Sequence, residues 1–212
     1  MTDGFVRLYR RGWSPQQVRR RVDSLAAAGM VLEHPRTGRI TALSGVWETM
    51  GEQVELDRDE LLAAMAGLTD AQFTFQYWMR DDEDADVVCT LSRVGPDVVV
   101  EDYDLDGFGG PIARTGQNTV IRPLLAEFRA TGLSAVGLVV DRWGPSRETD
   151  LDDIVTGGPS RVTVTPELLV LRPDVAQRHP ELPPPVPFAG FRAFDTDGIL
   201  VLAPRRPHRA PQ

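Results

Sequence analysis

Hydrophobic residues near the start of the chain recur at the spacing of an α-helix. The apolar positions that follow Ser14 and Pro15 lie three or four residues apart: Val18, Val22 and Leu25. Ser14 can cap a helix, Pro15 suits the first helical position, and Gly29 suits the end. We therefore predict a helix that begins near residue 14. Residues 5–11 also place their apolar side chains on one helical face and are predicted to form a shorter helix.

Two short apolar stretches follow this helix, one on each side of a turn. Residues 30–32 and 39–43 have the composition of strands, and Pro35 and Gly38 lie between them. We predict that these stretches pair as a β-hairpin. Residues 57–67 then begin with acidic side chains and continue with apolar residues on one face, which predicts another helix.

The middle of the chain contains strand patterns separated by turns. Three of them, at 72–79, 86–94 and 98–105, have connections short enough to favour an antiparallel meander. A helical pattern over 119–131 and a nearly continuous apolar run over 135–140 follow, and such a run predicts a central strand. The predicted fold class is α+β: a mainly antiparallel β-sheet with a β-β-β-α-β core, covered by a helix and preceded by an N-terminal helix plus β-hairpin module.

Charge divides the chain into two regions. Residues 1–39 contain eight arginines and three acidic residues, a net charge of +5, whereas the rest contains 15 arginines and 28 acidic residues. We predict a basic helix-hairpin module over 1–50, an acidic α+β domain over 51–203 and a disordered tail over 204–212. Further short strands are predicted in the acidic domain: 161–164, 168–171 and 199–202.

The amino-acid composition excludes several kinds of catalytic and metal-binding site. All 23 basic residues are arginines, so the chain has neither a Schiff-base lysine nor a P-loop lysine. Cys89 is the only cysteine, and the three histidines are too far apart in sequence for a zinc motif. We therefore expect a non-enzymatic role without a cofactor or a metal. No apolar run is long enough to span a membrane and the first residues lack an apolar signal segment, so we expect a cytoplasmic protein without a membrane partner.

The segment EDYDLDGFGG contains the first half of a calcium-binding loop. A complete loop needs a glutamate at its twelfth position, where this chain has Ala113. Because alternate residues of a strand share a face, we expect Asp102, Asp104 and Asp106 to form a solvated row at the end of a strand. A magnesium-dependent enzyme with a carboxylate cluster is the alternative, if the strands that carry Asp102, Asp104 and Asp141 are neighbours with aligned ends.

The stretch SPQQVRRRVDSLAAAGMVLEHPRTGRITAL resembles the second half of a winged helix domain, with a capped helix, a glycine turn and a two-stranded wing. In such domains the helix enters the major groove and the wing contacts phosphates. The resemblance implies a DNA-binding alternative with these contacts: Arg19, Arg20, Arg21, Arg36 and Arg39. The negative charge of the remaining chain would repel a phosphate backbone.

Acidic loops give the function that we favour from the sequence. Acidic residues gather in the first turn of the meander and at the end of its third strand, two places at the same end of the sheet. The predicted partner-binding residues are Asp82, Glu83, Asp84, Asp102, Asp104, Asp106 and Trp143. Such a surface suits a basic protein partner, because its negative charge would raise the rate at which the two proteins associate. We expect a protein-binding module of the immunity-protein, antitoxin or adaptor kind.

Overall fold

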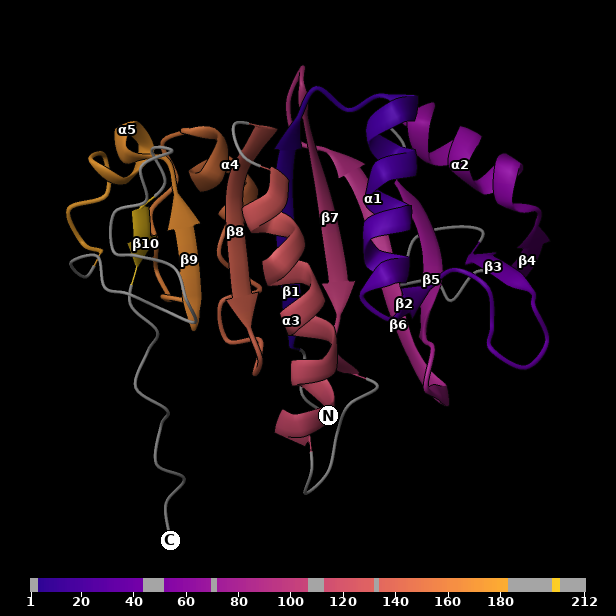
Figure 1. Ribbon diagram of the computed structural model, residues 1–212. Coiled ribbons are helices and arrows are strands. Elements are labelled where there is room, and N and C mark those ends of the chain that lie inside the picture. Colours follow the sequence, from indigo (N-terminus) through magenta and orange to yellow (C-terminus); the bar gives the residue numbers. More distant parts are fainter. Residues whose placement is uncertain are drawn as a thin grey trace, which may run out of the picture.

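The computed structural model describes residues 4–43, 52–69, 72–106, 113–131, 134–182 and 200–202. Within these residues one antiparallel sheet of ten strands crosses the molecule (Figure 1). The strand order is β10-β9-β8-β1-β7-β6-β5-β3-β4, and β2 pairs with β5. The strands are β1 (Phe5–Arg11), β2 (Met30–Val31), β3 (Ile40–Leu43), β4 (Gln53–Leu56), β5 (Phe73–Met79), β6 (Asp82–Arg93), β7 (Val98–Asp104), β8 (Ala135–Asp141), β9 (Leu168–Leu171) and β10 (Leu200–Leu202).

Helices cover parts of both faces of this sheet, which confirms the predicted α+β class. The helices are α1 (Pro15–Ala27), α2 (Arg58–Ala66), α3 (Ala113–Thr131), α4 (Leu151–Thr156) and α5 (Pro173–Ala176). The first three lie on one face (Figure 1), where their apolar residues pack with Val6 and Leu8 of β1. Residues of α4 and α5 pack with Phe5 and Tyr9 on the other face. Side chains from both sides of β1 therefore contribute to separate apolar cores.

The predicted helix over residues 5–11 is wrong, because this segment is strand β1 in the middle of the sheet. It pairs with β7 on one side and with β8 on the other. Both faces of β1 are covered by helices, so apolar residues occur on both faces. The resulting order of apolar residues along the chain resembles the spacing expected for a helix. Strands from residues 1–50 and from residues 51–203 thus belong to one sheet.

The predicted meander is confirmed as β5, β6 and β7, which pair in sequence order. The predicted central strand is β8, which lies between β1 and β9, and every residue of β8 is buried. The helix predicted over 119–131 is α3, which begins earlier, at Ala113. The strand predicted at 168–171 is β9, whereas residues 161–164 form no strand. The predicted tail, residues 204–212, lies outside the described residues.

The two-stranded wing expected from the winged helix resemblance is absent from the described residues. The strands β2 and β3 both pair with β5 instead: Met30 lies opposite Met79, and Ala42 lies opposite Phe75. The turn between them is closed by a backbone hydrogen bond from His34 N to Arg39 O of 2.8 Å. Pairing with β5 places both segments in the main sheet, where Met30 and Ala42 are buried in its core. No helix among the described residues is long and apolar enough to span a bilayer.

Candidate functional site: acidic loops and a buried arginine network

Four consecutive acidic side chains lie where β5 turns back into β6, with Asp81 in the turn and residues 82–84 at the start of β6. Residues 81–84 read DDED, and all four are exposed. The strand ladder reaches this turn, since Met79 pairs with Asp82, and the amide of Asp84 donates a 3.2 Å hydrogen bond to Asp82 Oδ1. We call residues 81–84 the acidic turn. The ladder has an irregularity here, because Trp78 pairs with Asp86 whereas the next residue, Met79, pairs with Asp82.

Ion pairing leaves the acidic turn almost unneutralised. Within the described part of the chain, its ion pair is that of Glu83 with Arg36, at 3.5 Å between Oε2 and Nε. Both side chains are well exposed, and pairs of this kind contribute little because water screens them. The acidic turn therefore presents a concentrated negative charge to solvent.

The expected solvated row at the end of β7 is wrong, because these aspartates are partly buried. Asp102 accepts a 2.9 Å hydrogen bond from Arg7 Nε, and Asp104 lies 3.6 Å from Arg147 Nη2. The amide of Asp106 donates a 2.9 Å hydrogen bond to Asp104 Oδ1. The local sequence pattern does not reveal that arginines of other segments lie beside these carboxylates. Asp102 and Asp104 thus already have internal partners.

The acidic turn and the aspartates at the end of β7 lie at the same end of the sheet but at different positions along the strand direction. Cys89 pairs with Tyr103 in the β6–β7 ladder, and Asp82 comes seven residues before Cys89. Val88 pairs with Gln76 and Asp82 pairs with Met79, so Asp82 lies only about 10 Å beyond the level of Asp104 at the usual rise of a strand. The acidic turn therefore extends beyond the end of β7.

The environment of Asp104 predicts a measurable pH dependence. Burial raises the pKa of Asp104 to about 6, more than the hydrogen bond from Asp106 and the attraction of Arg147 lower it. The folded state therefore keeps this proton at a pH where the unfolded chain has lost it, so stability falls as pH rises from about 4 to about 6. Asp104→Asn should remove this loss and still accept the bond from Asp106.

We expect Asp104→Asn to be more stable than the unchanged protein at pH 7.5, by about 1–2 kcal/mol after allowing for solvent screening of a partly exposed group. The two proteins should converge near pH 4. Urea unfolding at both pH values measures the difference, with the exposed Asp97→Asn as a control. Equal or lower stability of Asp104→Asn at pH 7.5 would contradict this account.

Asp102, Asp104 and Asp141 do not converge on one point, because β1 lies between β7 and β8. Phe5 pairs with Asp104 on one side and with Asp141 on the other. Asp141 is buried and accepts hydrogen bonds from the loop that follows it: the amides of Trp143, Gly144 and Ser146, and the Ser146 hydroxyl. Its carboxylate organises this loop and leaves the Trp143 side chain 57% exposed.

The arginines predicted to contact DNA do not form a common face. Arg21 is only 2% exposed and points into the molecule, so its assignment as a contact with the DNA backbone is wrong. The others are exposed, and three of them lie beside carboxylates: Arg19 by Asp59, Arg36 by Glu83 and Arg39 by Glu55. Arg20 has no ion pair among the described residues.

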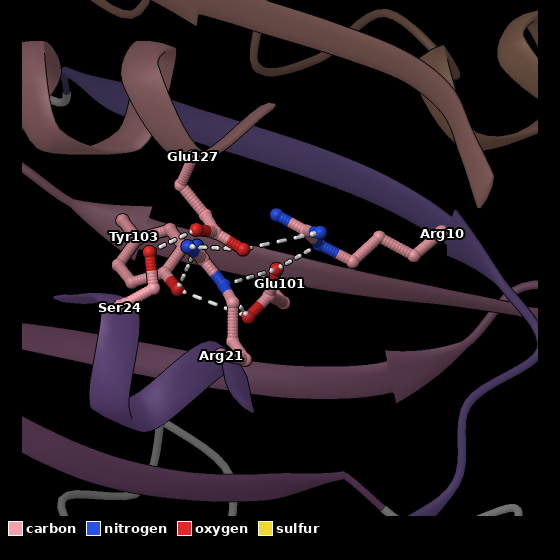
Figure 2. A network of polar contacts seen from close by, with 6 residues as sticks. All are labelled: Arg10, Arg21, Ser24, Glu101, Tyr103 and Glu127. Atoms are coloured by element: carbon pink, nitrogen blue, oxygen red, sulfur yellow. Dashed lines mark hydrogen bonds and ion pairs between the residues drawn. The ribbon is translucent and has the colours of Figure 1, made fainter. Parts of the chain in front are cut away.

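Beneath α1 and α3 the side chain of Glu101 anchors a buried polar network (Figure 2). Its Oε2 accepts a 2.8 Å hydrogen bond from Arg10 Nε, and its Oε1 accepts bonds from Arg21 Nε at 3.0 Å and from the Tyr103 hydroxyl at 3.1 Å. Burial acts to raise the pKa of Glu101, but attraction by Arg21 and Arg10 outweighs it and lowers that pKa. Glu101 is therefore a charged group of the folded interior.

Glu127 of α3 closes the network from above (Figure 2). Its Oε1 lies 3.7 Å from Arg10 Nη1 and 3.6 Å from Arg21 Nη1, and its Oε2 accepts a hydrogen bond from Ser24. The sequence held one signal for this network: Glu101 alternates with Val99 and Tyr103 on the face of β7 that turns toward the core. It gave no means of knowing which arginines would meet Glu101.

Comparisons with known proteins do not assign a family. No protein-family model matches the sequence, and no curated protein matches it. Among solved structures, a T6SS protein of Pseudomonas aeruginosa is similar with a TM-score of 0.46 and 13% identity, over 96% of this chain and 66% of that one. This chain spans slightly less than two thirds of that protein, and a likeness of this degree carries no argument about function.

Proposed function

We propose that this chain is a protein-binding module that recognises a basic protein partner through the acidic turn, residues 81–84. The observation that supports the proposal most is the display of four consecutive exposed acidic side chains at the end of a hydrogen-bonded hairpin. The pairing of Met79 with Asp82 and the hydrogen bond from the Asp84 amide to Asp82 Oδ1 reduce the backbone freedom that is lost on binding. The turn is thus a preorganised recognition element.

Electrostatics supports a basic partner. The acidic turn has a single weak ion pair in the described residues, and the whole chain has a formal net charge of −8 at pH 7. A negative surface of this kind steers positively charged partners and raises the rate of encounter. Trp143 is exposed at the same end of the sheet and would add an aromatic contact of the type that often anchors interfaces.

The function that fits this surface is neutralisation or tethering of a cationic protein. An immunity protein that blocks a basic toxin works in this way, and so does an adaptor that recruits a basic partner. Neither role needs catalytic residues in this chain. DNA binding has weaker support, because Arg21 is buried and three of the other four candidate arginines lie beside carboxylates.

A pull-down with matched charge variants tests the proposal. The turn variant neutralises the acidic turn with these changes: Asp81→Asn, Asp82→Asn, Glu83→Gln and Asp84→Asn. The control variant removes four exposed charges elsewhere: Asp59→Asn, Asp97→Asn, Glu148→Gln and Asp174→Asn. Both variants change the net charge by the same amount. A difference in the protein that they retain therefore reports where the charges lie and not the total charge.

Tagged protein is incubated with nuclease-treated lysate of the source organism, and retained proteins are quantified by mass spectrometry. We expect one stoichiometric basic protein that the control variant also retains and that the turn variant retains about tenfold less, as loss of several interfacial charges implies. Equal retention by the two variants, or no protein retained by the unchanged chain, would refute the role of the acidic turn.

A further inference from the structure

A basic cavity lies near the C-terminal end of β1, away from the acidic turn. It has a volume of about 250 Å³, and four arginines but only one glutamate line it. The chain as a whole is acidic, so this concentration of arginines is unusual for its surface. The cavity belongs to no feature used in the proposed function.

Two buried arginines form the floor of this cavity. The side chain of Arg21 is 2% exposed and that of Arg10 is 8% exposed, and Glu101 binds the Nε atom of each. These bonds fix both guanidinium groups, and the Glu127 carboxylate lies between their outer ends (Figure 2). The outer Nη1 atoms lie within 4 Å of Glu127, the one carboxylate in the lining. The floor is therefore preorganised and does not depend on flexible surface side chains.

The rim supplies further donors. Arg20 is exposed on α1, and the described residues give it no ion pair and no hydrogen bond. Ser24 and Gln17 also line the cavity, and Trp13 forms part of its wall. The Trp13 indole N–H donates a 2.8 Å hydrogen bond to Met65 O, which fixes the ring. A ligand would thus meet a rigid wall and a cation able to move onto it.

We propose that this cavity binds the phosphate group of a small ligand. A phosphate carries close to two negative charges and three acceptor oxygens, and planar guanidinium groups bind such oxyanions with paired hydrogen bonds. Glu101, Glu127 and Asp97 lie beside three of the four arginines, and Arg20 supplies the positive charge that has no ion pair among the described residues. The volume is below the usual range for drug-sized ligands, so the ligand is small.

Two variants of exposed helical arginines allow a matched test. Arg20→Gln removes the rim cation, and Arg122→Gln removes an exposed arginine of α3 that does not line the cavity. Neither side chain has an ion pair in the described residues, so both variants should fold. Inorganic phosphate is titrated from about 0.1 to 30 mM, a range that saturates a site of millimolar Kd. Chloride and acetate at equal ionic strength serve as the comparison anions.

Binding is followed by NMR through the Trp13 indole N–H and the backbone amides of residues 10–24. We expect saturable shifts with phosphate that chloride and acetate do not produce. Arg20→Gln should weaken phosphate binding about tenfold, as loss of a charge-assisted contact implies, and Arg122→Gln should leave it unchanged. The proposal is overturned if phosphate produces no saturable shift, if acetate binds equally well, or if the two variants behave alike.

Discussion

Replacement of Glu101 with glutamine is expected to destabilise the fold by about 3–5 kcal/mol, the usual cost of removing one partner from a buried ion pair. Glu101 is fully buried, and it accepts hydrogen bonds from both Arg10 and Arg21. Glutamine keeps the shape of the side chain but removes the charge. Among the described residues, the carboxylate left beside both guanidinium groups would then be Glu127, whose contacts are longer. Urea unfolding at pH 7 measures the loss.

The control for this change is Glu55→Gln, which removes the same charge from an exposed pair with Arg39. Exposed pairs contribute about 1 kcal/mol at most, so this variant should remain close to the unchanged protein. Because the pKa of Glu101 is lowered in the folded state, its contribution is present above about pH 4.3 and is lost as pH falls further. A loss for Glu101→Gln no larger than that for Glu55→Gln would contradict the buried network.

Replacement of Asp141 with alanine is expected to cost about 3 kcal/mol or more, because each buried donor left without a partner costs about 1–3 kcal/mol. The carboxylate accepts four hydrogen bonds, among them 2.9 Å from Ser146 N and 2.5 Å from Ser146 Oγ. Its side chain is buried, so water cannot easily replace it. Thermal unfolding with and without millimolar magnesium measures both the cost and any metal effect.

Two controls separate the loop role of Asp141 from other effects. Ser146→Ala removes one of the four bonds and should cost about 1 kcal/mol. Asp97→Ala removes an exposed aspartate and should change stability by no more than about 0.5 kcal/mol. If magnesium stabilised the unchanged protein but not Asp141→Ala, the carboxylate would be a metal ligand and our account of it would fail.

The sequence predicted the elements whose signals are local. Short turns at 80–85 and 95–97 identified the β5–β6–β7 meander, and the continuous apolar run of β8 identified a strand buried on both faces. The capped start of α1 at Ser14 was also readable, since its hydroxyl accepts a bond from Gln17 N. These features depend on neighbouring residues alone, which is why pattern and propensity were sufficient.

Features that depend on distant partners were not predicted. β1 was interpreted as a helix because neither of its partner strands, β7 and β8, is near it in sequence. The prediction of a two-stranded wing was wrong for the same reason. Both β2 and β3 pair with β5, which lies far from them in the sequence. A local sequence pattern cannot reveal which distant strand a segment pairs with.

The same limit applies to the candidate site. Arg21 reads as one of three surface arginines, and only the packing of α1 against β7 turns it toward Glu101. The acidic turn was identified from sequence because its exposure follows from its place at the tip of a hairpin. Asp102 and Asp104 were misjudged as solvated because Arg7 and Arg147 approach them from other segments.

Hydrogen exchange of the chain in complex with its retained partner tests the central claim most directly. The proposal predicts that the partner slows exchange most strongly in peptides that span residues 79–86, and that raising the salt concentration reverses this protection. Protection confined to other segments, with unchanged exchange across residues 79–86, would show that the acidic turn is not the recognition element.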